Sequence, residues 1–187
     1  MTQILRYFVY IALLIFSVLL TTILFFSFQL PDDSSLQNYK PNVMTRIHAS
    51  NGDLVKEFSR EYRIFIPIKD IPTDLINAFI SAEDKNFYGH LGVDPIGIVR
   101  AFYKNSINFF TDKRPEGAST ITQQVAKNFL LSDELSIKRK IKEGLLAIKI
   151  EQNLSKDRIL ELYLNQIYLG SGTYGIAAAS NRYFKKS

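Results

Sequence analysis

Three short polar segments hold the side chains that could do chemistry in this sequence. The first places a carboxylate pair, Glu83-Asp84, at the end of an apolar helical pattern. Aromatic residues flank the pair: Phe79, Phe87 and Tyr88. They could desolvate one carboxylate and raise its pKa, which is what a general base near neutral pH requires. A solvated helix end is the ordinary alternative for such a pair.

The second segment, residues 116–127, places a glycine and hydroxyl residues at the predicted start of a helix. Backbone N–H groups at such a start favour an anion, although Ser119 or Thr120 could equally be an ordinary helix cap. Further hydrogen-bond donors lie on or near the same helix: Gln123, Gln124 and Lys127. The segment could therefore bind a sugar or a phosphate, but its spacing is not that of a Walker loop.

The third segment, residues 136–143, combines cations with a carboxylate. On a helix, Glu143 lies one turn from both Arg139 and Lys140, and a stripe of isoleucines lies on a different face. The ordinary interpretation is a solvated face with weak ion pairs. Two apolar residues point close to the direction of the glutamate, however: Leu146 and Ile150. We therefore expect a partly buried carboxylate among cations, which suggests a site for a bound anion.

Composition excludes several other kinds of site. The chain has no cysteine, which rules out disulfides, a thiol nucleophile and Cys-ligated metals. Its two histidines, His48 and His90, leave little room for a His-rich metal site, and His90 alone is typical of a structural hydrogen bond. A net charge of +5 fits nucleic acid, an anionic membrane or a phosphate ligand, and does not choose between them.

The N-terminus predicts a membrane anchor. Residues 7–28 carry no charge and, at a rise of about 1.5 Å each, span a hydrocarbon core of about 30 Å. A cleaved signal peptide is the alternative, but its apolar part is shorter and no small-residue cleavage site follows. Arg6 favours a cytoplasmic N-terminus, residues 1–6, which places residues 29–187 outside the cytoplasm. Residues 29–42 are polar and turn-rich, as a tether would be.

The remaining sequence predicts a small β-element followed by helices. Residues 43–48 and 54–58 flank Asn51-Gly52, a strong hairpin signal, and residues 63–68 alternate as a third short strand would. From Pro72 onward the apolar period becomes helical. The further helical stretches are residues 95–110, 120–130, 136–152, 155–166 and 175–183.

Read in order, these segments closely resemble the motifs of the peptidoglycan glycosyltransferases. This family comprises the glycosyltransferase domains of class A penicillin-binding proteins and their monofunctional relatives. The resemblance rests on Glu83-Asp-Lys-Asn-Phe with His90-Leu-Gly, Gly117-Ala-Ser-Thr-Ile-Thr-Gln-Gln, Arg139-Lys-Ile-Lys-Glu, residues 156–165 and residues 170–184. It covers residues 43–187, and five motifs in order at compatible spacing are highly specific.

The resemblance implies a fold and an activity. The fold would be mainly α (α+β), a lysozyme-like domain with a small membrane-proximal β-element, preceded by one transmembrane helix. The enzyme would be an inverting glycosyltransferase that polymerises lipid II into glycan strands at the outer face of a bacterial cytoplasmic (inner) membrane. Its partners would be lipid II, the growing strand, membrane lipids and other cell-wall synthesis proteins, but no nucleic acid.

The resemblance also implies residue roles. Glu83 would be the general base, and Glu143 the second glutamate near the departing diphosphate. The substrate-binding residues would be Asp84, His90, Arg100, Ser119, Thr120, Gln123, Gln124, Lys127, Arg139 and Lys140. No certain metal ligand and no required cofactor are implied, although a divalent cation such as Mg²⁺ or Mn²⁺ helps some members of the family.

Two departures from the family pattern keep alternatives open. Leu135 stands where the family usually has a basic residue, and the chain ends before the family's further helices. No Ser-x-x-Lys motif occurs, so we expect no transpeptidase nucleophile and interpret the chain as an N-terminal piece of a longer bifunctional protein or a truncated gene product. A lysozyme-like glycan hydrolase and a non-catalytic lipid II-binding scaffold are the alternative functions.

Overall fold

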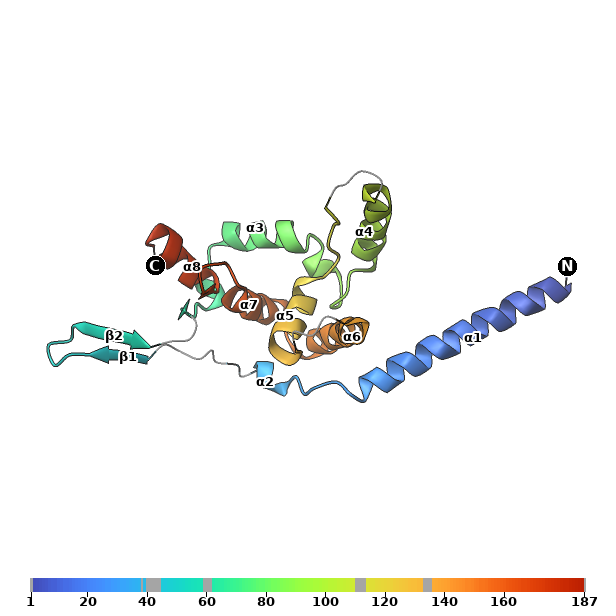
Figure 1. The fold of residues 1–187 in the computed structure, drawn as a ribbon, viewed down its shortest axis with the longest axis horizontal. Coiled ribbons are helices and arrows are strands. Elements are labelled where there is room, and N and C mark those ends of the chain that lie inside the picture. Colours follow the sequence, from blue (N-terminus) through green and yellow to red (C-terminus); the bar gives the residue numbers. More distant parts are fainter. Residues whose placement is uncertain are drawn as a thin grey trace.

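The computed structural model describes residues 2–37, 39, 45–58, 62–109, 114–132 and 136–186. Within these ranges the chain is mainly helical, as the sequence predicts, with one apolar helix at the N-terminus and a helical domain after it (Figure 1). The helices are α1 (Thr2–Ser27), α2 (Ser34–Gln37), α3 (Thr73–Glu83), α4 (Pro95–Asn108), α5 (Ile121–Leu130), α6 (Ile137–Asn153), α7 (Lys156–Gln166) and α8 (Ile176–Phe184). Two short 3-10 turns, η1 (Ile68–Asp70) and η2 (Phe87–Gly89), flank α3.

Helix α1 is apolar on all sides and is not covered by the domain. Within residues 3–27 an 18-residue window has a mean hydropathy of 2.6, and the helix is long enough to cross a membrane. The helix extends away from the rest of the molecule, with its C-terminal end beside α6 (Figure 1). A helix that is apolar all round is typical of a lipid environment.

The β-element is a hairpin that stands apart from the helices. Strands β1 (Thr45–His48) and β2 (Leu54–Phe58) pair antiparallel, and the turn between them contains Gly52 at φ +88°. The predicted hairpin is thus confirmed over its described residues. Figure 1 shows it at the opposite end of the molecule from the N-terminus of α1.

The third predicted strand is shorter than expected. Strand β3 contains only Tyr62 and Arg63, and it pairs parallel with β4 (Thr173–Tyr174), while residues 64–67 run on without strand pairing into η1. The side chain of Asn165 explains why this stretch pairs with a helix instead of a sheet. Its amide accepts a hydrogen bond from the backbone N–H of Ile66 (2.9 Å) and donates one to the Ile66 carbonyl (2.8 Å).

The core lies where α5, α6 and α7 meet. Side chains one helical turn apart point inward and are fully or almost fully buried: Ile121, Val125, Leu146, Ile150, Ile159 and Tyr163. Helix–helix packing of this kind removes apolar surface from water, and each Å² of apolar surface that is buried stabilises the fold by about 25 cal/mol. It provides the rigid support from which the polar segments project.

The segment after α1 lies against this core. Leu36 of α2 is 1% exposed and belongs to the core cluster, and Arg158 donates hydrogen bonds to the carbonyls of Leu36 and Tyr39. Asp33 is also buried and forms an ion pair with Lys149 (2.8 Å). Burial alone would raise the pKa of Asp33, but the hydrogen bonds from Lys149 and Asn153 outweigh it and hold the pKa below its usual value. The described part of the expected tether is therefore docked on the domain.

Candidate active site

Glu83 is the last residue of α3, and its carboxylate points into solvent-accessible space. Gln124 from α5 donates a hydrogen bond from Nε2 to Glu83 Oε2 at 2.9 Å. The solvated alternative therefore describes Glu83, and the buried carboxylate of the pair is its neighbour Asp84. Phe79 instead packs on Tyr163, with ring centroids 6.2 Å apart, and the ring of Phe87 is buried under the Lys156 ammonium. Glu83 itself is exposed and held from one side.

Asp84, the next residue, is the buried carboxylate of the pair. It is 6% exposed and accepts hydrogen bonds from His90 Nε2 and from the backbone N–H of Ile121, each at 3.0 Å. His90 Nδ1 accepts from the Gly92 N–H (3.1 Å), which assigns the ring proton to Nε2 and makes the imidazole neutral. This network ties the end of α3 to the start of α5.

The start of α5 is fixed by a capping box. The Thr120 hydroxyl accepts from the Gln123 backbone N–H, and the Gln123 side chain accepts from the Thr120 N–H (2.9 Å). The Thr120 hydroxyl also donates to the Gly92 carbonyl at 2.6 Å. Both side chains are buried. In this structure Asp84, His90, Thr120 and Gln123 therefore position the site, and their contact with substrate stays a prediction.

Lys140 links the start of α5 to α6. Its ammonium donates to the Ser119 hydroxyl (2.7 Å) and forms an ion pair with Glu143, one turn further along the helix. Glu143 is 3% exposed, which confirms the expected burial of this carboxylate among cations. Arg139 directly precedes Lys140 on the helix, so its side chain points in a different direction, and it lines a separate pocket near residues 29–31.

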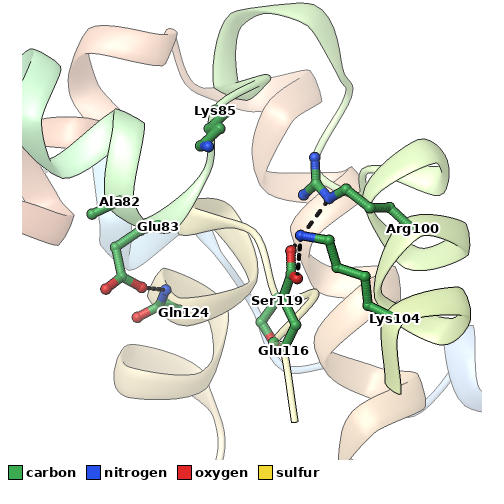
Figure 2. A pocket seen from close by; sticks show the side chains of 9 residues that line it. Ala82, Glu83, Lys85, Arg100, Lys104, Glu116, Ser119 and Gln124 are labelled. Carbon is green, nitrogen blue, oxygen red and sulfur yellow. Dashed lines mark hydrogen bonds and ion pairs between the residues drawn. The ribbon is translucent and has the colours of Figure 1, made fainter. Parts of the chain in front are cut away.

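A pocket of about 330 Å³ opens between the end of α3, helix α4 and the start of α5. Four predicted site residues line it: Glu83, Arg100, Ser119 and Gln124. Figure 2 shows Glu83 and Gln124 on one wall, and the side chains of Arg100 and Lys104 pointing at Glu116 on the other. The pocket thus combines the exposed carboxylate of Glu83 with three cations, Lys85, Arg100 and Lys104, and with a second carboxylate, Glu116, that pairs with two of them.

Sequence reasoning missed three polar residues of this pocket. Lys85 and Lys104 line it without having been given a role, and Glu116 forms ion pairs with Lys104 (2.7 Å) and Arg100 (3.4 Å). The hydrogen bond from Lys104 and the nearby positive charges hold the pKa of Glu116 below its usual value. The four-residue spacing of Arg100 and Lys104 on one helix face was the signal that could have found this cluster.

Two further predicted residues lie outside this pocket or outside the described chain. Lys127, in the last turn of α5, is half-buried and does not line the pocket. Leu135, the departure from the family pattern, lies outside the described residues.

Within the ranges described above, no three His, Asp or Glu side chains are grouped as a metal site requires. The expected help from a divalent cation therefore stays a prediction.

Comparison with known proteins identifies the family. The family described as Transglycosylase matches residues 51–187. The chain belongs to the transglycosylase family. It is 50% identical over 183 residues to penicillin-binding protein 1A of Rickettsia conorii, covering 98% of this chain and 23% of that protein. It is 48% identical over 159 residues to penicillin-binding protein 1A of Escherichia coli K12, covering 85% and 18%.

Membership of the transglycosylase family confirms the resemblance drawn from the motifs. It supports a peptidoglycan glycosyltransferase, and neither alternative function gains support from it. The chain spans about a fifth of the length of the curated relatives it matches. The relatives therefore contain much that this transglycosylase domain does not.

Proposed function

We propose that this chain is a peptidoglycan glycosyltransferase that extends glycan strands from lipid II and releases polyprenyl diphosphate. The observation that carries the proposal is the arrangement of Glu83 in the pocket. Its exposed carboxylate is held by Gln124 and faces Arg100 and Lys104, which share the one carboxylate of Glu116 across the pocket. A base near cations is what this reaction needs, because the acceptor must lose a proton while the donor loses a diphosphate.

In the proposed reaction Glu83 takes the proton from the 4-hydroxyl of the acceptor sugar. The hydroxyl oxygen then attacks the anomeric carbon of the donor from the face opposite the diphosphate, so the configuration inverts. The donor's bond to the diphosphate oxygen breaks, and the electron pair leaves with the diphosphate. Holding both sugars in line removes much of the entropic barrier.

The cations of the site stabilise the leaving diphosphate. Lys140 already has one anionic partner, Glu143, and half of its side chain is exposed, so it can reach a second anion. Because these cations carry the charge that develops on the diphosphate, we propose that no resident cofactor is required. Polymerisation that persists undiminished in excess EDTA supports this part, and complete loss that Mg²⁺ restores contradicts it.

The buried residues beneath the pocket keep its two walls in register. Asp84 fixes the backbone directly after Glu83 and also caps α5, which carries Gln124. The capping box fixes the residue that follows Ser119. A displacement of about 1 Å between reacting groups costs about a hundredfold in rate, so this support matters for catalysis.

We further propose that α1 anchors the enzyme in the cytoplasmic membrane in a single pass, with the domain on the outer face. The support is the length and hydropathy of α1 together with Arg6 before its apolar stretch. A polyprenyl substrate stays in the bilayer, so an anchored enzyme meets it there. Contacts with other cell-wall synthesis proteins belong to the same proposal.

A hydrolase is disfavoured by the cations around the pocket. Hydrolysis of a glycan expels a sugar hydroxyl, and the protonated leaving group needs an acid instead of positive charge. Here Arg100 and Lys104 lie opposite Glu83 and pair with Glu116, and these cations hold the pKa of Glu116 below its usual value, which makes it a poor acid. A scaffold would have no need of an exposed carboxylate held in such a place.

The test uses the full chain, lipid II in liposomes and separation of the products on a gel. Glu83→Gln should abolish polymer formation, because the amide cannot accept the proton. The matched control is Asp74→Asn, which neutralises an exposed carboxylate at the other end of the same helix and should keep activity. Polymer made by Glu83→Gln at the wild-type rate would refute the base. Shortened preformed glycan would indicate a hydrolase, and binding without turnover a scaffold.

A further inference from the structure

A second pocket, of about 430 Å³, lies at the junction of the apolar helix and the domain. One wall is the chain directly after α1, at Gln29, Leu30 and Pro31, and the other is the first part of α6. It is separate from the Glu83 pocket, and the two share no lining residue. Its place in the fold sets its depth, because it begins two residues beyond the end of α1.

Helix α6 continues this junction along α1. Ile141 lines an apolar pocket together with residues of α1 between Leu14 and Ile23. Ile137, one turn earlier, is 82% exposed. If α1 spans the bilayer, these isoleucines lie at the boundary between acyl chains and headgroups. An exposed apolar side chain beside cations is typical of a helix at a membrane surface.

The described lining of this second pocket is cationic and has no acidic residue. Lys138, Arg139 and Lys142 line it, and within the described ranges no ion pair joins any of them to a carboxylate. The Nε of Arg139 is buried and has no hydrogen-bond partner among the described residues. The remaining lining includes two leucines at the end of α5, Leu130 and Leu131. Cations that have no ion-pair partner among the described residues, next to leucines, suit a ligand with a phosphate head and an apolar body.

We propose that this pocket binds the headgroup of an anionic phospholipid of the surrounding bilayer. The phosphate would lie between Lys138, Arg139 and Lys142, and the glycerol and first methylenes would lie against the leucines. This inference rests on the proposed membrane anchoring, which places such lipids at the depth of the pocket. The diphosphate of the polyprenyl substrate has related chemistry, so the experiment must separate the two sources.

The experiment measures binding of short-chain phosphatidylglycerol to the full chain in a neutral detergent by calorimetry. Wild-type protein should bind phosphatidylglycerol and not phosphatidylcholine of the same chain length. Each of Lys138→Gln and Lys142→Gln should weaken binding about fivefold, the usual contribution of one lysine near an anionic surface. The matched control, Lys185→Gln with Lys186→Gln, removes two exposed charges near the C-terminus and should leave binding unchanged. Equal loss in the control, or no preference for phosphatidylglycerol, overturns the proposal.

A second arm adds a polyprenyl diphosphate to the phosphatidylglycerol complex. Under the proposal the two ligands bind together, because the diphosphate would bind at Lys140, which donates to Ser119 of the Glu83 pocket and does not line this second pocket. Displacement of phosphatidylglycerol by the diphosphate assigns the pocket to the substrate and overturns the proposal. Failure of the anchoring itself is distinguishable, since the protein would then not co-float with vesicles of any composition.

Discussion

The buried network of Asp84 makes a quantitative prediction about stability. In Asp84→Asn the shape of the side chain is kept, but one of the two acceptor oxygens becomes an N–H donor. That donor faces either His90 Nε2–H or the Ile121 N–H, both now 3.0 Å from Asp84 oxygens. A hydrogen bond to a charged group contributes about 1.5–3 kcal/mol, and an opposed pair of buried donors adds to the loss. We therefore expect the free energy of unfolding to fall by about 3 kcal/mol.

Thermal unfolding in detergent, followed by circular dichroism, measures this effect. For a chain of this size about 3 kcal/mol corresponds to a decrease in Tm of about 6–12 °C. The matched control is Asp94→Asn, which caps α4 through the Ile96 N–H and is also buried. Asparagine caps a helix as well as aspartate does, so its Tm should change little.

A double-mutant cycle tests whether the partners are those that the structure shows. Adding His90→Gln to Asp84→Asn should cost less than the sum of the single changes, with a coupling of about 1 kcal/mol or more. A Tm of Asp84→Asn within about 2 °C of the Asp94→Asn control would refute the reasoning. It would mean that Asp84 does not join α3 to α5.

Other parts of the molecule make separate predictions. Gly92→Ala should lower the free energy of unfolding by about 3 kcal/mol or more, because φ is +94° and a Cβ would lie 2.5 Å from the α6 backbone. The control in the same thermal assay is Gly117→Ala, since a Cβ at Gly117 would meet nothing within 4 Å. Lys140→Met should slow lipid II polymerisation about a hundredfold, because it removes a positive charge that would stabilise the leaving diphosphate. A rate within twofold of wild type would show that Lys140 does not stabilise the leaving group. The same change should lower the free energy of unfolding by about 1–2 kcal/mol, because the buried Glu143 carboxylate loses its Lys140 partner. The loss is moderate because the Lys140 side chain is half exposed. The lowered pKa of Asp33 means that docking of residues 29–37 is complete above about pH 4 and weakens as the pH falls through the folded-state value. Protection factors in this segment, which are corrected for the intrinsic exchange rate at each pH, should be lower at about pH 3 than at about pH 6, and Asp33→Asn should remove the difference.

The helices of the domain were predictable because their signals are local. Ser136, Ser155 and Thr120 are N-caps whose side chains accept from the third helical residue, and each predicted helix begins within one residue of them. The hairpin was predictable for the same reason, since Asn51-Gly52 specifies its turn. Local hydrogen bonding alone fixes these boundaries.

The environment of each carboxylate was less predictable, because it depends on contacts between distant segments. Adjacent residues at a helix end point in different directions, so Glu83 is exposed while Asp84 is buried. The sequence does not say that Ile121, 37 residues later, supplies a partner for Asp84. On α6 the isoleucine stripe is the more exposed side, with Ile137 82% and Ile148 40% exposed, while Glu143 faces the core. Periodicity identifies a face but not what covers it.

In the proposed membrane-anchored enzyme, the docked segment after α1 limits how the pocket can move relative to the bilayer. A flexible chain of the same length would allow excursions of roughly 20 Å, and the domain would tumble at its end. With Asp33 and Leu36 fixed on the domain, the linkage has almost no slack. The height of the pocket above the bilayer and its tilt are then set by the position and tilt of α1 itself. Inserting a few flexible residues at Gln29 would therefore change the geometry of substrate delivery without touching any residue of the pocket.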